Sequence, residues 1–191
     1  MNDRMIEIWN SKNFVVLDTE TTGLKAPCEI IDIAILNADG QTILSSLVKP
    51  RRGIPDFIQG LTGIRPEDSS SSSTWPTIRD FVINAIKGKV VITYNATFDR
   101  QMFHCSDDTW ELSRYEYKHI STWECAMTAY APYHGDWNSQ YNDWRWAKLT
   151  DAMHEQKLPV VDAHRAYGDA LMTWKLLEHM CTGGQDRRDT Q

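Results

Sequence analysis

The strongest constraint on the fold is a short apolar run that ends in two acids. Residues 13–17 read Asn-Phe-Val-Val-Leu, and Asp18-Thr19-Glu20 follow directly. A run of β-branched and aromatic residues that stops at a polar cluster predicts a buried strand. Alternate residues of a strand point to the same face, so Asp18 and Glu20 can project together. The chain is therefore expected to hold two carboxylates close together at a strand end.

Similar patterns farther along predict an alternation of strands and helices. Strands are expected at 30–37 and 43–49, joined by the hairpin signal Asp39-Gly40. A fourth and a fifth strand are expected at 89–94 and 117–121. A hairpin followed by strands alternating with helices predicts an α/β fold, with a mixed five-stranded sheet flanked by helices. The expected helices are 55–60, 74–87, 97–105, one running through Met127, 147–156 and 166–181.

Composition favours one soluble domain. The 191 residues suffice for one buried core, so we expect a domain over 1–181 and a short, flexible polar tail over 182–191. No apolar run reaches the length of a membrane span and the start lacks a signal-peptide core, so we expect a cytoplasmic protein. The four cysteines form no close pair, which predicts reduced thiols and neither a zinc ribbon nor a redox motif.

Two further segments carry acids that could join the first pair. Asp99 follows the fourth predicted strand, and ligands of open α/β sheets bind at the carboxyl ends of strands. The alternative is that Asp99 only caps a helix. His164 and Asp169 are five residues apart, which separates them by about 140° on an ideal helix. If both reach one site, His164 must lie in the loop that enters the helix, and Asp162 is the predicted N-cap. The alternative for His164 is a hydrogen bond to the backbone.

Closely spaced carboxylates indicate a metal site. Two like charges raise each other's pKa unless a cation lies between them. Carboxylate oxygens suit hard cations such as Mg²⁺ or Mn²⁺. An Asp-x-Glu triplet by itself is common in polar loops, so the conjunction of the three segments carries this prediction.

Taken together, these segments resemble the DEDDh (DnaQ-like) group of 3′–5′ exonucleases, which includes the proofreading epsilon subunit of bacterial DNA polymerase, ribonuclease T and oligoribonuclease. The resemblance spans about residues 14–181, and a sister group has Tyr in place of the histidine. Ser121-Thr122 departs from the Asp-Thr that relatives often carry, at a position that is not a ligand. The matching segments are Asp18-Thr19-Glu20-Thr21-Thr22-Gly23-Leu24, Leu61-Thr62-Gly63-Ile64, Asn95-Ala96-Thr97-Phe98-Asp99 and His164-Arg165-Ala166-Tyr167-Gly168-Asp169.

The resemblance implies an RNase H-like fold and a two-metal hydrolysis of the terminal phosphodiester that releases nucleoside 5′-monophosphates. His164 would accept a proton from the attacking water, near neutral pH. The implied metal ligands are Asp18, Glu20, Asp99 and Asp169, which with His164 make up the catalytic set. The implied substrate-binding residues are Thr19, Thr21, Thr22, Leu24, Asn95 and Phe98, for which turn formation and core packing are the alternatives.

The net charge of −6 limits the kind of substrate. Tight binding of duplex DNA draws on neutralisation of phosphates by basic residues. Weak, salt-sensitive binding of single-stranded DNA 3′ ends fits an acidic chain better. RNA trimming remains the alternative because the catalytic residues do not read the 2′-hydroxyl. A non-catalytic binding module is disfavoured because a pure binder gains nothing from clustered acids. No polymerase partner is indicated, and a homodimer stays open because several relatives are dimers.

A segment outside the family core is rich in aromatic residues. Aromatic and basic side chains together can stack and steer single-stranded bases. The alternative, which we favour, is a loop packed on its own aromatics. The residues concerned are Tyr133, His134, Trp137, Tyr141, Trp144, Arg145 and Trp146.

Overall fold

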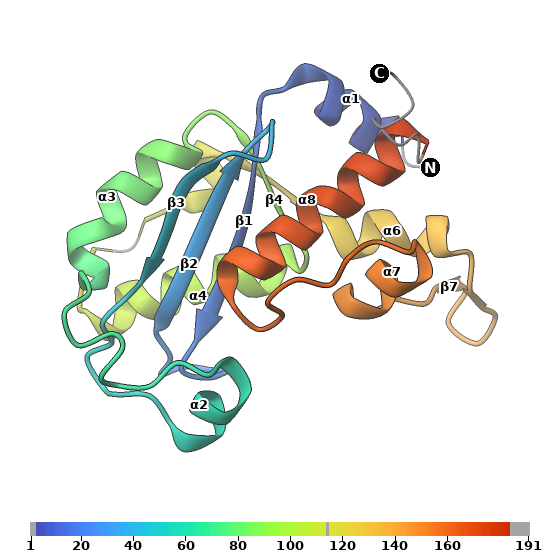
Figure 1. Cartoon of the computed structure of the whole chain (residues 1–191). Helices are drawn as coiled ribbons and strands as arrows, with labels where there is room; N and C mark the ends of the chain where they lie inside the picture. Colours follow the sequence, from blue (N-terminus) through green and yellow to red (C-terminus); the bar gives the residue numbers. More distant parts are fainter. Residues whose placement is uncertain (1–2, 114, 184–191) are drawn as a thin grey trace, which may run out of the picture.

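The computed structural model describes residues 3–113 and 115–183, and it contains a five-stranded sheet with helices on both faces (Figure 1). The strand order is β3-β2-β1-β4-β5. The predicted α/β fold with a mixed five-stranded sheet is therefore confirmed. The last helix includes Thr182, and most of the predicted tail, 184–191, lies outside the described residues.

The sheet combines antiparallel and parallel pairing. Strands β1 (Phe14–Thr21), β2 (Ile30–Asn37) and β3 (Thr42–Leu47) form an antiparallel meander. Strands β4 (Val90–Thr93) and β5 (Thr122–Cys125) run parallel to β1. The register pairs Glu20 of β1 with Asp32 of β2. Asp32 of β2 is thus a third acidic residue at the carboxyl end of β1.

The position of the fifth strand differs from the prediction. Residues Tyr117–Ile120 form the short helix α5, and the strand begins only at Thr122. The prediction of a strand over 117–121 was wrong because its aromatic and branched residues serve a helical turn. Tyr117 is fully buried and its hydroxyl donates a hydrogen bond to Asp107 at 2.8 Å, while Ser121 closes the turn by donating to the Tyr117 carbonyl oxygen.

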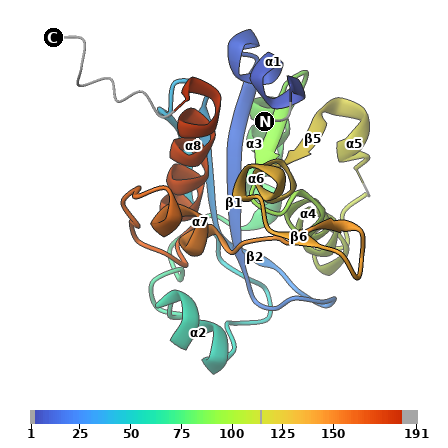
Figure 2. The same cartoon turned by 90° about the vertical axis from the view of Figure 1, so that its right-hand side faces the viewer.

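Two apolar layers sandwich the sheet because alternate residues of β1 face opposite sides. Val15 and Leu17 pack with helices α3 (Trp75–Ile86) and α4 (Ala96–Thr109). On the other face, Phe14 and Val16 pack with four more helices. These helices are α1 (Asp3–Ser11), α6 (Ala126–His134), α7 (Leu149–Glu155) and α8 (Ala166–Thr182). Figure 2 views the molecule from the side on which α6 and α7 lie.

Several helices differ from the sequence expectation in existence or length. Helix α1 was not predicted, although its buried Met5, Ile8 and Trp9 have helical spacing. Helix α6 ends at His134, well beyond the predicted Met127. The short helix in the loop region is α2 (Asp56–Thr62), close to the predicted 55–60. Within the described residues, we find no helix long and apolar enough to cross a membrane.

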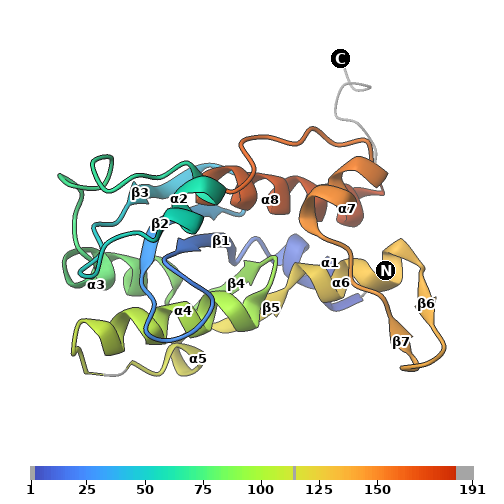
Figure 3. The same ribbon diagram turned by 90° about the horizontal axis from the view of Figure 1, so that it is seen from below.

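A small hairpin lies outside the main sheet. Strands β6 (Trp137–Asn138) and β7 (Asp143–Trp144) pair antiparallel after the end of α6. Figure 3 shows them extending from the body of the molecule beyond α6. The sequence reasoning treated this stretch as a loop and did not predict the hairpin.

Candidate active site

Three of the predicted metal ligands meet at one end of the sheet. Asp18 and Glu20 lie near the end of β1, and Asp169 lies in the first turn of α8. One carboxylate oxygen from each residue lies within 4.8 Å of the other two. Figure 1 shows why they meet, since α8 crosses the sheet with its beginning beside the end of β1 and the beginning of β2. Two segments at opposite ends of the chain thus form one acidic cluster.

Asp99 lies beside this cluster in the first turn of α4, which follows β4. Its side chain is buried, and the Thr19 hydroxyl donates a hydrogen bond to its Oδ1 at 2.9 Å. The N-cap position of α4 is occupied by Asn95, so Asp99 does not cap the helix. Its negative charge raises the pKa of Asp18, which shows that the two carboxyl groups are neighbours.

The protonation equilibria of the acids reflect their crowding. Desolvation and then the charges of Asp99 and Asp169 raise the pKa of Asp18 well above its usual range. Desolvation followed by repulsion from Asp169 raises the pKa of Glu20 to about 8. Desolvation raises the pKa values of Asp99 and Asp169 to about 6 each. A set of oxygen ligands that repel one another in this way fits a hard divalent cation, which would offset the repulsion.

His164 lies in the loop before α8, as its five-residue distance from Asp169 requires. The helix begins at Ala166, and His164 is exposed with a φ of 64°. The nearby imidazole of His164 and a hydrogen bond from its backbone counter part of the desolvation that raises the pKa of Asp169. The N-cap is Arg165 and not Asp162, so the predicted cap position was wrong. Asp162 instead takes a left-handed turn, with a φ of 45°.

Gly168 allows the His164 loop to pack against α8, a role that the sequence reasoning missed. A Cβ atom at Gly168 would lie 2.5 Å from the carbonyl oxygen of Val161 and would also collide with that of Asp162. The backbone of 161–162 therefore lies directly on the first turn of the helix. The spacing between His164 and Asp169 depends on this close approach.

Asp32 is a second residue that the sequence reasoning missed. It is buried opposite Glu20, and its Oδ2 accepts hydrogen bonds from Arg165 Nε at 2.9 Å and from the Ala166 N–H at 3.3 Å. Its charge raises the pKa of Glu20, whereas the charge of Arg165 lowers it. A lone acid inside the apolar strand 30–36 is the signal that could have identified it, because buried charges are rare unless they are paired.

A cavity of about 390 Å³ adjoins the acidic cluster. Asn95, Lys148, His164 and Asp169 line it, together with Trp146 from the end of the aromatic segment. The hydroxyl of Tyr94, another lining residue, donates to the Ala147 carbonyl oxygen at 2.7 Å and fixes the loop that carries Trp146. The acids thus border a space that could receive a substrate group.

The sequence pattern of the RNase_T family, described as exonuclease, matches residues 15–177. The chain belongs to this exonuclease family. The matched stretch contains Asp18, Glu20, Asp99, His164 and Asp169. This exonuclease is 30% identical over 179 residues to "Uncharacterized exonuclease CP81" of Escherichia phage 186, and the alignment covers 92% of each chain.

Solved structures of exonucleases share the fold. Exonuclease X in complex with 5′ overhanging duplex DNA superposes with a TM-score of 0.64 at 22% identity, over 92% of this exonuclease and 95% of that chain. The nuclease domain of 3′hExo, a DEDDh family member bound to rAMP, gives a TM-score of 0.69 at 17% identity, over 91% and 94%. The predicted relationship to the DEDDh exonucleases and the RNase H-like fold are confirmed.

The predicted substrate-binding residues of this exonuclease lie in β1 and the loop after it, and at the start of α4. At the end of β1, the Thr21 hydroxyl donates to the Gly23 carbonyl oxygen at 2.9 Å, and Thr22 exchanges hydrogen bonds with the Glu29 backbone. These hydroxyls shape the loop that leaves Leu24 75% exposed. At the N-cap of α4, Asn95 is exposed beside the cavity.

Two members of the predicted substrate-binding set have contacts within the fold. The Thr19 hydroxyl is engaged by Asp99, which makes Thr19 a residue that orients an acid. Phe98 is half-buried and packs against the core layer beneath α3 and α4. The related segment Leu61 to Ile64 closes α2, with Gly63 in a left-handed conformation at φ 71°.

Proposed function

We propose that this exonuclease removes nucleotides from the 3′ end of single-stranded or frayed DNA, with two Mg²⁺ or Mn²⁺ ions as cofactors and nucleoside 5′-monophosphates as products. The convergence of the Asp18, Glu20 and Asp169 carboxylates within 4.8 Å carries this proposal. The carboxylates of this cluster repel one another when ionised, and this repulsion raises their pKa values. Without a cation, the ionised cluster is therefore unfavourable in the folded protein. Divalent ions would make the arrangement stable and chemically useful.

Each acid has a role that follows from its position. When bound, the ions would polarise the attacking water and stabilise the leaving oxygen. Asp18 and Glu20, held by β1, and Asp169, held by α8, would supply oxygen ligands. Asp99 would contribute directly or through a water molecule, because it lies beside the cluster and is oriented by Thr19.

His164 is the proposed general base. Its place on an exposed loop beside Asp169 lets the imidazole reach a water at the cluster and take up its proton. Leu24, Asn95 and Phe98 would contact the terminal nucleotide, as would the backbone near Thr21 and Thr22. Thr21 and Thr22 follow Asp18 and Glu20 directly along the chain, and Asn95 lines the same cavity as Asp169.

The preference for single-stranded DNA rests on the net charge of the protein. One structural relative was solved with duplex DNA and another with rAMP, so the fold is compatible with either sugar. The net charge of −6 favours weak, salt-sensitive binding of single strands over tight duplex binding. RNA trimming is the second candidate function.

The catalytic proposal is tested by release of mononucleotides from a 5′-labelled single strand in Mg²⁺. Asp18→Asn and His164→Ala are each expected to lower the rate by about 100-fold or more, since even outer partners of metal ligands contribute about 10–100-fold. Asp80→Asn and His119→Ala, both at exposed positions remote in sequence from the site, are matched controls and should leave the rate unchanged. Full activity in both site variants, or activity in excess chelator, would contradict the mechanism.

Substrate choice is tested on matched single-stranded DNA, single-stranded RNA and mismatched duplex, each labelled at the 5′ end. We expect progressive shortening from the 3′ end, fastest on single-stranded DNA and slowed by added salt. Faster digestion of the RNA would favour the second candidate. Loss of the 5′ label as a mononucleotide before any shortening would show the opposite polarity and refute the 3′–5′ direction.

A further inference from the structure

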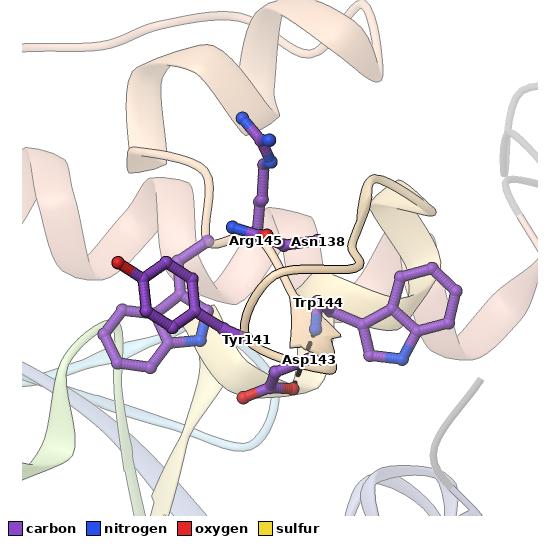
Figure 4. A pocket seen from close by; sticks show the side chains of 6 residues that line it. Asn138, Tyr141, Asp143, Trp144 and Arg145 are labelled. Carbon is purple, nitrogen blue, oxygen red and sulfur yellow. Dashed lines mark hydrogen bonds between the residues drawn. The ribbon is translucent and has the colours of Figure 1, made fainter.

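The hairpin beyond α6 forms a pocket of its own. An open pocket of about 470 Å³ lies against β6, β7 and the residues that follow them (Figure 4). In the close view, the Tyr141 and Trp144 side chains project in opposite directions from the hairpin. The lining residues are Asn138, Tyr141, Asp143, Trp144, Arg145 and Trp146.

The aromatic residues of the hairpin fall into two groups. Trp137 and Trp144 contact each other edge to face across the strands, with ring centroids 5.0 Å apart. The expected self-packing of this segment therefore holds for one pair. Tyr141 and Trp146 remain 73% and 63% exposed, and both line the pocket. Two large aromatic rings are thus exposed to solvent on a segment that lies outside the main sheet.

The pocket and the cavity of the candidate active site share one lining residue. Trp146 lines the hairpin pocket and also the 390 Å³ cavity that contains His164 and Asp169. A strand with its 3′ end at the acids could therefore pass from the cavity onto the indole and then onto Tyr141. No other described residue lines both spaces.

Positive charge accompanies this path in an otherwise acidic protein. Lys148 lines the cavity, and Arg145 lines the hairpin pocket. Arg145 forms an ion pair with Asp136 at 3.6 Å in which both side chains are at least half exposed. Such a surface pair contributes little, so the guanidinium can exchange Asp136 for a phosphate at small cost. Exposed rings beside basic groups are the features that hold single strands without sequence preference.

We propose that the segment 137–146, here called the aromatic hairpin, binds unpaired nucleotides upstream of the 3′-terminal one. Their bases would stack on Trp146 and Tyr141, and Arg145 would contact a phosphate. The inference rests on the proposed function, because it takes the 3′ end to lie at the acids. The aromatic hairpin therefore requires several unpaired nucleotides at the 3′ end, because a base stacked within a duplex cannot stack on Trp146 or Tyr141.

Binding is measured by fluorescence anisotropy with 5′-labelled oligothymidylates in Mg²⁺, on a His164→Ala background that keeps the acids and slows hydrolysis. Strands of about 4 and about 16 nucleotides span the range of single-strand site sizes. Trp146→Ala and Tyr141→Ala are each expected to weaken binding of the longer strand about tenfold, from the strength of base stacking, and to affect the shorter one much less. Trp146→Phe should retain most of the affinity.

Phe81→Ala is the matched control, because Phe81 is a half-exposed aromatic on α3 rather than on the hairpin. It should bind both strands like the parent. An unchanged melting temperature checks that each variant folds. Arg145→Gln, which removes no ring, should weaken binding and reduce its salt dependence. Equal affinity of the parent, Trp146→Ala and Tyr141→Ala for the longer strand would overturn the proposal and point to another partner for the hairpin.

Steady-state digestion separates this proposal from the proposed function. With His164 intact, the two ring variants should raise KM on long strands and leave kcat unchanged. Equal KM values in parent and variants would overturn the role of the aromatic hairpin while leaving the exonuclease proposal intact. A parent protein that releases no nucleotide would count against the proposed function, and the anisotropy measurement would still decide whether the hairpin binds a single strand.

Discussion

Arg165 donates a hydrogen bond from its Nε to the Asp32 carboxylate at 2.9 Å, which ties the beginning of α8 to β2. The same carboxylate accepts the Ala166 N–H at 3.3 Å. Asp169 lies one turn farther along the helix, and Glu20 lies opposite Asp32 in the sheet. The Asp32–Arg165 pair therefore sets how close the acid of α8 comes to the acids of β1.

Replacing Asp32 by Ala should weaken catalysis although Asp32 is not a proposed ligand. We expect a loss of about 10–100-fold in rate, as for other partners that orient metal ligands, and a higher Mg²⁺ concentration for half-maximal activity. A Mg²⁺ titration of the rate measures both effects. Asp39→Ala, in the exposed turn after β2, is the control. An unchanged Mg²⁺ requirement in Asp32→Ala would show that the pair does not position the acids.

The protein without metal should lose stability as the pH rises. Desolvation and mutual repulsion raise the pKa values of Asp18 and Glu20 in the fold, the latter to about 8. Between about pH 4 and about pH 8 the folded chain then holds more protons than the unfolded chain, so raising the pH favours unfolding. The melting temperature in chelator should therefore be lower at about pH 8.5, just above this range, than at about pH 5.5, inside it.

Two further measurements isolate the cause of this pH effect, one with added Mg²⁺ and one with a substitution. Mg²⁺ at the higher pH should restore much of the lost stability, because ligand binding stabilises the folded state. Asp18→Asn should reduce the loss in chelator, whereas Asp80→Asn should show the parent's loss in full. A melting temperature in chelator that does not change over this pH range would contradict the crowding of the carboxylates.

Substitution of Gly168 by Ala should disturb the His164 loop. The added methyl group would collide with the carbonyl oxygens of Val161 and Asp162, and such overpacking costs about 1–3 kcal/mol. We expect a lower melting temperature and a lower kcat, since the loop must move away from α8. Gly60→Ala is a matched control, because Gly60 lies in α2 with open space around it. There the substitution should stabilise the helix by about 0.5–1 kcal/mol. A fully active and stable Gly168→Ala would disprove the close packing.

The strands and the acids at their ends could be predicted from the sequence because both depend on local patterns. The run 14–17 is apolar and β-branched, which fixes β1 and places Asp18 and Glu20 at its end. Helical geometry alone placed His164 before the helix that carries Asp169. These inferences need only the periodicity of the backbone.

Features that depend on distant contacts could not be predicted in this way. The contact of Asp32 joins residues 133 positions apart, and no local pattern names Arg165 as its partner. The fifth strand was misplaced because the burial of Tyr117 depends on Asp107 of α4. The aromatic hairpin was missed because its strands have two residues each and no apolar alternation. In each case tertiary contacts outweigh the local preference.

The order of the acids along the chain has a consequence during synthesis. Asp18 and Glu20 leave the ribosome before Asp169, which belongs to α8, and Leu176 and Leu177 of the same helix also complete one core layer. On the proposed chemistry, a nascent polypeptide lacks a working centre until α8 has emerged and docked.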